Sequence, residues 1–454
     1  YVVAPRDEEL ADGATSRFRR DWIYRVTWRD GVLASAEVVR EPARWYRRCE
    51  RSVGAPKINR AEGDWGGRER AAAAARTVIS PFRPSSLPSS MHTSARAGLA
   101  ERVTLFSESV IREMTRLANR CSAVNLAQGM PDFDPPAEVI EAAAKALRDG
   151  FNQYAITWGA PALREAVAQK ARAFNGISWA DADKHVTVTC GSTEAMMCGV
   201  LAMVNPGEEV VVFSPWYENY GPDAKLAQAR PVYVELTGPA WTFDAEELRK
   251  AMSSGRVKAI IVNTPHNPTG KVFTRDELGL IARLCVEHDV WAITDEIYEH
   301  ILYDGREHVS IATLPGMAER TVTISGLSKT FSVTGWRLGY AIGPEEVTAG
   351  IRRVHDFLTV GAPHPLQMAG VAALKLPPTY YKAMLDGYVE RREVLCGALL
   401  AAGFEFAPPQ GAYYVMTECT PWGWEDDAAF VRELLIPQIG VAAVPGSSFY
   451  APRS

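Results

Sequence analysis

Short apolar runs alternate with amphipathic helical segments from Met91 onward, and this alternation restricts the possible folds more than any other feature of the chain. The strand-like runs lie at 185–190, 209–214, 231–236, 258–264, 290–295 and 321–325. Helical patterns such as those at 192–204 and 275–289 lie between them. Because the runs are apolar on both faces, we expect helices to cover both sides of a mainly parallel sheet. The predicted fold class is therefore α/β.

Polar and aromatic residues follow these runs at the points where strands would end. The groups are Gly191-Ser192-Thr193, Pro215-Trp216-Tyr217, Asn267-Pro268-Thr269-Gly270, Asp295 with Tyr298, and Ser328-Lys329 with Arg337. Since ligands bind outside the carboxyl ends of strands in open α/β sheets, we expect these groups to meet on one rim. The turn at Ser192 and Thr193 opens a helix, and helix N-termini bind anions such as phosphate.

Together these groups offer an anion cradle, an aromatic cover, a carboxylate, a phenol, an amine and a guanidinium. That set fits a planar, phosphorylated, nitrogen-containing aldehyde. A lysine amine can bond the aldehyde, and a buried carboxylate can keep the ring nitrogen protonated, because a nearby opposite charge favours the charged form. A protonated ring of this kind serves as an electron sink for a substrate carbanion.

Six blocks of the sequence resemble, in the same order, those of class I/II aminotransferases that depend on pyridoxal 5'-phosphate (PLP), of the kynurenine and aspartate aminotransferase kind. The blocks are AQGMPDF (127–133), YAITWGAPALREA (154–166), NTPHNPTG (263–270), TDEIY (294–298), TISGLSKTFSVTGWRLGY (323–340) and QGAYY (410–414). The resemblance extends from about residue 100 to about residue 450. It implies the PLP-dependent transferase fold type I, in which a large domain with a mixed, mainly parallel sheet flanked by helices is joined to a smaller α+β domain.

The resemblance also implies roles for individual residues. Lys329 would be the catalytic residue, as the Schiff-base lysine and the carrier of the proton. The residues implied to bind the cofactor are Lys329, Asp295 at the ring nitrogen, Tyr298 and Asn267 at the phenolic oxygen, Arg337, Ser192, Thr193 and Ser328 at the phosphate, and Tyr217 on the ring face, with Trp216 second. Tyr154 would reach the phosphate of the neighbouring subunit's cofactor, which implies a homodimer with shared active sites.

For the substrate, the resemblance implies contacts with Gly129, Asn267 and Trp158. Gly129 would let the backbone approach the substrate carboxylate, since glycine has no side chain to prevent it. Trp158, Tyr217 and Tyr220 suggest room for bulky side chains, but the sequence does not identify the amino donor or acceptor.

The chain departs from the family pattern at two places. Many relatives carry a phosphate-binding serine three residues before the lysine, and Gly326 stands there, so Ser328 or Ser325 would have to replace it. Relatives also end with a strand whose arginine forks onto the substrate carboxylate, a pairing that lysine cannot copy. The sequence stops at GVAAVPGSSFYAPRS (440–454), and Arg453 lacks the matching context. We therefore expect a chain truncated at its C-terminus.

The predicted activity is aminotransfer from an amino acid to a 2-oxo acid by a ping-pong mechanism. A PLP-dependent carbon–sulfur β-lyase on the same fold is the nearest alternative, because residue types at the cofactor do not separate the two. The aminotransferase-like effector domain of a transcription regulator is a third possibility. The basic N-terminal region suggests it, but that region lacks a helix-turn-helix pattern.

Residues 1–90 differ in composition from the rest, with 17 Lys and Arg against 12 Asp and Glu. They end in a Pro/Ser-rich stretch at 80–90 that is typical of a linker, and a hairpin around Asp30-Gly31 is possible. Either this region is upstream or fused sequence before a natural start at Met91, or it is a poorly structured extension. We predict four parts: the extension and linker (1–90), the N-terminal part of the small domain (95–144), the large PLP-binding domain (145–350) and the C-terminal part of the small domain (351–454).

Composition excludes several other classes of protein. The net charge of -5 does not favour nucleic acid or membrane partners, and no apolar run is long enough to span a bilayer. Seven scattered cysteines without a C-x-x-C pair indicate a reducing cytoplasm rather than a disulfide framework. The eight histidines lack ligand spacing, so we predict no metal.

Overall fold

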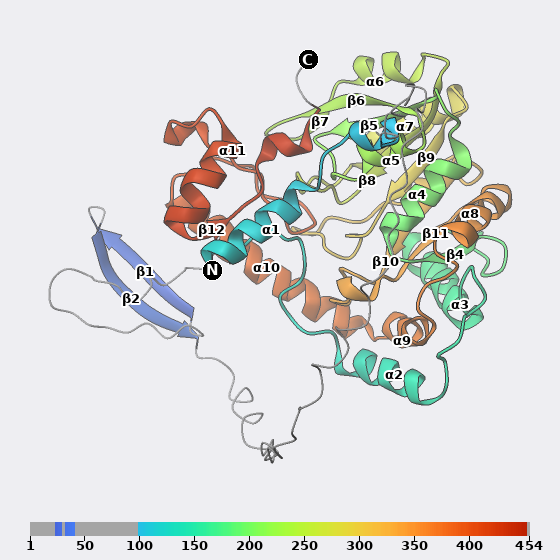
Figure 1. The fold of residues 1–454 in the computed structure, drawn as a ribbon, viewed down its shortest axis with the longest axis horizontal. Coiled ribbons are helices and arrows are strands. Elements are labelled where there is room, and N and C mark those ends of the chain that lie inside the picture. The colour runs from blue at the N-terminus through green and yellow to red at the C-terminus, as the bar shows by residue number, and fades with distance from the viewer. Residues whose placement is uncertain (1–22, 30–31, 41–98, 452–454) are drawn as a thin grey trace, which may run out of the picture. The chain divides into compact units, whose positions relative to one another are not determined.

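The computed structural model describes residues 23–29, 32–40 and 99–451, in two units that are treated separately: Val2–Leu99 and Ala100–Ser454. In the first unit, β1 (Ile23–Arg29) and β2 (Val32–Arg40) pair antiparallel, with Arg29 opposite Val32 (Figure 1). This pairing agrees with the hairpin expected around Asp30-Gly31. The predictions for the linker at 80–90, for Met91 and for Arg453 fall outside the described residues.

The second unit contains the remaining helices and strands. Its strands are β3 (Val124–Asn125), β4 (Val186–Thr189), β5 (Glu209–Ser214), β6 (Arg230–Thr237), β7 (Thr242–Phe243), β8 (Val257–Asn263), β9 (Trp291–Asp295), β10 (Thr321–Gly326), β11 (Gly339–Ile342) and β12 (Val441–Ala442). Its α-helices are α1 (Val110–Cys121), α2 (Ala137–Arg148), α3 (Pro161–Lys170), α4 (Ser192–Met203), α5 (Tyr220–Leu226), α6 (Ala245–Met252), α7 (Arg275–Glu287), α8 (Glu345–Leu358), α9 (His364–Leu374), α10 (Pro378–Ala401) and α11 (Asp427–Ala429). Within the described ranges, no helix combines the length and the apolar character needed to cross a bilayer.

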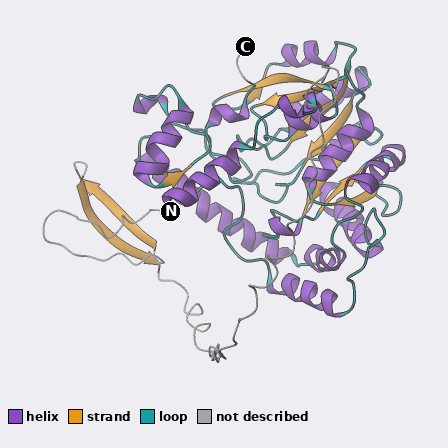
Figure 2. Ribbon diagram, viewed as in Figure 1, coloured by secondary structure: helices purple, strands orange, loops and turns teal. Residues whose placement is uncertain are grey.

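Eight strands form one sheet in the order β4-β11-β10-β9-β8-β5-β6-β7. The five strands from β10 to β6 run parallel to one another, while β11 is antiparallel to both of its neighbours and β7 is antiparallel to β6. The sheet is therefore mixed and mainly parallel, as predicted. Figure 2 shows its strands in orange among the helices.

Alternate residues of the central strands pack against different helix layers. On β5, Val210 and Val212 belong to a core shared with α4 and α8, whereas Val211 and Phe213 belong to a core shared with α6 and α7. Successive side chains of a strand point to opposite faces, so a strand covered on both sides must be apolar throughout. This double burial explains why the run at 209–214 shows no polar alternation.

The two ends of the second unit meet in a small two-stranded sheet. β3 pairs parallel with β12, and Met114 and Ala118 of α1 pack with Val431 and Ile436 from the segment Phe430–Ile439. Glu113 and Arg432 form an ion pair across the same contact, with Nη2 and Oε2 3.1 Å apart. These contacts agree with a small domain built from both ends of the chain, although its boundaries remain a prediction.

Candidate active site

The predicted site residues follow strand ends that lie on one edge of the sheet. β5, β8, β9 and β10 are parallel and end at Ser214, Asn263, Asp295 and Gly326. β4 runs in the same direction, because β11 is antiparallel to both β4 and β10. The turn after β4, which leads into α4, therefore lies on the same edge.

Asp295 is a buried carboxylate with a precise partner. Only 6% of the residue is exposed, and its Oδ2 accepts a hydrogen bond of 2.7 Å from the Tyr220 hydroxyl. Burial raises the pKa of Asp295 to about 6, against the opposing effects of the bonds from Tyr220 and from the Ile297 N–H. Asp295 therefore remains an anion at neutral pH, as a partner for a protonated ring nitrogen must.

Lys329 lies in the turn after β10, and its amine is enclosed. Its Nζ donates a hydrogen bond of 2.7 Å to the Gly129 carbonyl. Burial lowers the pKa of Lys329 to about 8; the charge of Asp295 opposes this shift and the charge of Arg337 adds to it. A substantial fraction of neutral amine is thus present near neutral pH, which nucleophilic and general-base chemistry both require.

The N-terminus of α4 and Arg337 form a cradle of positive character. Gly191 precedes the helix with a φ of 85°, and a Cβ there would lie 2.5 Å from a guanidinium nitrogen of Arg337. Ser192 and Thr193 open the helix and are partly exposed. A cation beside unpaired N–H groups at a helix N-terminus favours a phosphate.

Two tyrosine rings lie beside the amine of Lys329 and a third tyrosine is bonded to one of them; two of the three received no role from the sequence. The predicted Tyr298 shares a hydrogen bond of 2.8 Å with the hydroxyl of Tyr414, and the Tyr413 hydroxyl donates to the Gly129 carbonyl at 2.8 Å. The Nζ of Lys329 lies 5.8 Å from the Tyr298 ring centroid and 5.6 Å from that of Tyr413. A Cβ at Gly129 would collide with the Tyr414 hydroxyl, so a side chain there would displace that hydroxyl.

The two aromatic residues after β5 have different surroundings. Trp216 is 6% exposed and stacks on Tyr233, with ring centroids 4.2 Å apart, so it belongs to the core. Tyr217 is half-buried and meets Tyr220 edge to face at 5.7 Å. Since Tyr220 also holds Asp295, Tyr217 is the better placed of the two to cover a ring.

The turn after β8 is tied to Asp295 through Asn263, a residue that the sequence did not single out. The Asn263 amide donates to the Asp295 carbonyl at 2.8 Å, and its oxygen accepts the Asn267 N–H at 2.7 Å. Asn267 itself is 5% exposed. This arrangement holds the Asn267 turn beside the end of β9.

Gly326 leaves little room for the serine that many relatives carry. It lies opposite Gly339 on β11, and a Cβ would come within 2.7 Å of the Leu338 carbonyl oxygen. Of the two replacement serines, Ser325 donates its hydroxyl to Glu299 at 2.7 Å, which directs it away from a phosphate. Ser328 is buried in the turn beside Lys329.

Tyr154 and Trp158 lie on a loop before α3 and are not part of the cluster around Lys329. Tyr154 is 85% exposed. The Trp158 ring lies 5.1 Å from the guanidinium carbon of Arg352 on α8. The substrate contact of Trp158 stays a prediction.

A buried ionic network lies behind Asp295 and Tyr298. Glu299 pairs with Lys170, with Oε1 and Nζ 2.5 Å apart, and Asn175 donates to Glu299 at 2.7 Å. Burial alone would raise the pKa of Glu299, but the charge of Lys170 lowers it to about 2. Because Glu299 follows Tyr298 directly, this pair fixes the turn that carries the predicted cofactor residues.

We expect Lys170→Met to destabilise the protein by roughly 3–5 kcal/mol, because it leaves a buried carboxylate without its partner. The unfolding free energy from denaturant titration at pH 7 measures this effect. The Lys170–Glu299 contribution is complete above the ordinary glutamate pKa of 4.5, and it is lost as the pH falls from there through about 2. Lys382→Met, at an exposed ion pair with Asp386, should change the free energy by less than about 0.5 kcal/mol. Equal losses in the two variants would contradict this assignment.

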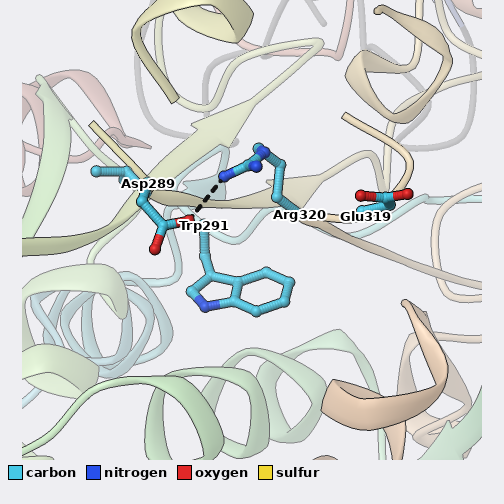
Figure 3. A pocket seen from close by; sticks show the side chains of 5 residues that line it. Asp289, Trp291, Glu319 and Arg320 are labelled. Carbon is cyan, nitrogen blue, oxygen red and sulfur yellow. Dashed lines mark hydrogen bonds and ion pairs between the residues drawn. The ribbon is translucent and has the colours of Figure 1, made fainter. Parts of the chain in front are cut away.

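A cavity of about 110 Å³ lies at the other edge of the sheet, beside the start of β9. Trp291, Glu319 and the ion pair of Arg320 with Asp289 line it (Figure 3). It is smaller than the pockets that hold cofactors and small ligands. The candidate site is therefore the opposite edge of the sheet, where the amine of Lys329, the carboxylate of Asp295 and the guanidinium of Arg337 lie.

The donor set fits PLP, with an amine of lowered pKa, a buried anionic carboxylate and a cationic cradle whose glycine makes room for Arg337. Fold and donor set together define a fold-type I enzyme that depends on this cofactor. Residues 122–454 match the aminotransferase class I and II family, and the chain belongs to that family. The resemblance seen in the sequence is confirmed, and the chain is a PLP-dependent aminotransferase.

Three relatives illustrate the match. The solved structure of an N-succinyldiaminopimelate aminotransferase from Mycobacterium tuberculosis has a TM-score of 0.76 at 38% identity, over 79% of this chain and 93% of that one. The methionine aminotransferase of Escherichia coli is 36% identical over 75% of this chain and 88% of its own length. Human kynurenine–oxoglutarate transaminase 1 is 36% identical over 75% of this chain and 87% of its own length.

Proposed function

We propose that the cluster around Lys329 is the site at which this aminotransferase holds PLP and transfers the amino group. The observation that carries the proposal is geometric: β4, β9 and β10 end on one edge of the sheet, which brings the Lys329 turn, Asp295 and the start of α4 together, and the Arg337 guanidinium lies at Gly191. The effects of Asp295 and Arg337 on the pKa of Lys329 agree with this arrangement. PLP, when bound, supplies the aldehyde and the electron sink. Lys329 would bond the cofactor aldehyde, and once the substrate amine has displaced it, the freed amine would carry the proton. Asp295 would hold a proton on the ring nitrogen.

The other side chains orient the cofactor. Arg337, Ser192, Thr193 and Ser328 bind the phosphate, and Tyr217 covers the ring face. Tyr298 and Asn267 donate hydrogen bonds to the ring's phenolic oxygen, and Tyr414 orients the Tyr298 hydroxyl through the bond between them. Gly129 and Asn267 face the substrate carboxylate.

For the substrate, we propose an amino donor with a long or aromatic side chain. The rings of Tyr298 and Tyr413 beside the Lys329 amine offer apolar contact area, which such side chains require. Kynurenine and methionine, which the names of two relatives specify, are the first donors to test.

The test incubates the holoenzyme with kynurenine, methionine or aspartate plus 2-oxoglutarate, and measures glutamate. Glutamate formation with a higher kcat/KM for kynurenine or methionine than for aspartate supports the proposal. A preference for aspartate contradicts the proposed substrate class. Release of pyruvate and ammonia from cystathionine, without glutamate formation from any donor, would favour the β-lyase chemistry instead.

We further propose a cytoplasmic homodimer. Two large side chains on neighbouring segments support the dimer: Tyr154 is 85% exposed and Phe357 on α8 is 93% exposed. The Thr157 carbonyl, three residues after Tyr154, accepts a hydrogen bond from His355 on α8, so these segments are held together. A partner subunit that covered both side chains would remove this apolar surface from water. The six cysteines of the described region are free, which suits a reducing compartment.

Mixing subunits tests whether Tyr154 acts in the neighbouring site. We expect Tyr154→Ala and Lys329→Ala to be nearly inactive separately and to recover about a quarter of wild-type activity when co-refolded. Random assortment makes half of the dimers mixed, and each mixed dimer has one site free of both changes. The measurement is glutamate formation per mole of protein.

The control mixes Lys329→Ala with Asp295→Asn, since both residues lie in one chain's own site. That mixture should recover nothing. If the Tyr154 mixture also recovers nothing while both variants form dimers by analytical ultracentrifugation, the shared site is wrong.

A further inference from the structure

His355 on α8 is completely buried, and both of its ring nitrogens have partners. Nδ1 lies 2.8 Å from Oε1 of Glu194, and Nε2 lies 2.8 Å from the carbonyl oxygen of Thr157. A carbonyl oxygen can only accept a hydrogen bond, so Nε2 carries a proton. The charge of the ring therefore depends on whether Glu194 is ionised.

Glu194 accepts hydrogen bonds from two further donors. The Thr359 hydroxyl donates to its Oε1 at 2.5 Å, and the Cys190 N–H donates to its Oε2 at 2.5 Å. Three donors stabilise the ionised form of a carboxyl group. With Glu194 as an acceptor only, Nδ1 of His355 must also donate, and the ring is an imidazolium.

This ion pair joins two segments that carry predicted phosphate ligands. Glu194 lies in the first turn of α4, directly after Ser192 and Thr193. Thr157 lies three residues after Tyr154 in the loop before α3. A single protonated ring thus fixes the cradle for the chain's own cofactor and the loop that carries Tyr154.

We propose that His355 is a positioning residue for the phosphate of PLP, holding the start of α4 and the Tyr154 loop in place through its imidazolium form. The proposal rests on the phosphate site given under Proposed function. A neutral ring has a single N–H donor and keeps only one of the two contacts. Deprotonation therefore releases one segment and weakens the grip on the phosphate.

The charges around the ring agree with a protonated state at neutral pH. Burial alone would lower the pKa of His355, but the hydrogen bond and charge of Glu194 outweigh it and raise the pKa above 6.5. Asp356 on α8 acts in the same direction. The other titratable groups near the pair are the Cys190 and Cys198 thiols, whose pKa values burial raises, and Arg337, which acts on Cys190. A contact that requires the charged ring is present at low pH and is lost as the pH rises through the raised pKa.

The test compares the dissociation constant of PLP in the wild type and in His355→Gln, by equilibrium dialysis of the full chain. We expect the variant to bind PLP about tenfold more weakly near pH 6, and almost equally at an alkaline pH above the raised pKa of His355, where the wild-type ring is neutral too. The ratio of the two constants cancels the titration of groups that both proteins share. Pyridoxal, which lacks the phosphate, should give a ratio near one at both pH values.

Thr359→Val is the matched control, because it removes one donor to Glu194 but keeps the imidazolium, so its ratio should not change with pH. A His355→Gln ratio that is the same at both pH values overturns the proposal, and so does an equal loss for pyridoxal. If His355→Gln does not fold, Glu194→Gln takes its place with the same expected result. Failure of the wild type to bind PLP at either pH would instead refute the phosphate site itself.

Discussion

Replacement of Lys329 by alanine should lower kcat by roughly 10²–10⁴-fold from the loss of proton transfer alone. The buried amine, with its pKa lowered to about 8, is the proposed base for the transfer, and alanine offers no substitute. The variant should also lose the covalent link to PLP. After borohydride treatment and denaturation, the wild type should keep the chromophore and Lys329→Ala should release it.

Lys145→Ala provides the control for this change, because the Lys145 side chain is 70% exposed and pairs only with Asp149 in the contacts described. It should keep wild-type kcat and the linked chromophore. Retention of the chromophore by Lys329→Ala would show that another amine bonds the cofactor.

Replacement of Asp295 by asparagine should lower kcat by roughly 10²–10³-fold, the usual cost of removing one preorganised electrostatic partner. The amide is nearly the same shape but carries no charge, so it cannot hold a proton on the ring nitrogen. Steady-state kinetics of glutamate formation measure the loss. The Tyr220 hydroxyl can still donate to the amide oxygen, so stability should change little.

Asp223→Asn is a matched control on α5. Asp223 is 5% exposed, close to the 6% of Asp295, and its Oδ2 has no hydrogen-bond partner among the described residues. Burial raises the pKa of Asp223 to about 8, so the group is largely neutral at pH 7 and the amide mimics it. A loss of kcat in Asp223→Asn as large as that in Asp295→Asn would show that the effect is not specific to the ring nitrogen.

The candidate site residues at the strand ends could be predicted as a group, because parallel strands bring residues from separate parts of the sequence to one edge of the sheet. Asp295 ends one apolar run, Ser192 and Lys329 come shortly after two others, and all parallel runs end at the same edge. β11 was not predicted, because it starts inside the lysine block and its four residues are too few to show a period of their own.

Contacts between distant segments could not be predicted in the same way. Tyr414 lies 116 residues after Tyr298, and local patterning does not indicate that their hydroxyls share a hydrogen bond. The block QGAYY was noticed, but Tyr413 and Tyr414 received no site role from it. Tyr220 was noted only as room for a bulky substrate, not as the partner of Asp295. The sequence also left open whether Ser325 or Ser328 replaces the missing phosphate-binding serine. The answer depends on Glu299, whose carboxylate accepts a hydrogen bond from the Ser325 hydroxyl.

The pairing of β3 with β12 has a consequence for synthesis of the chain. Met114 and Ala118 are buried by Val431 and Ile436, which leave the ribosome more than three hundred residues later. At a synthesis rate of about 5–20 residues per second, the apolar face of α1 stays unburied for roughly 15–60 s until Val431 and Ile436 are made. During this interval the nascent chain offers that face to chaperones, and a ribosome stalled before Phe430 would release a protein that cannot bury it.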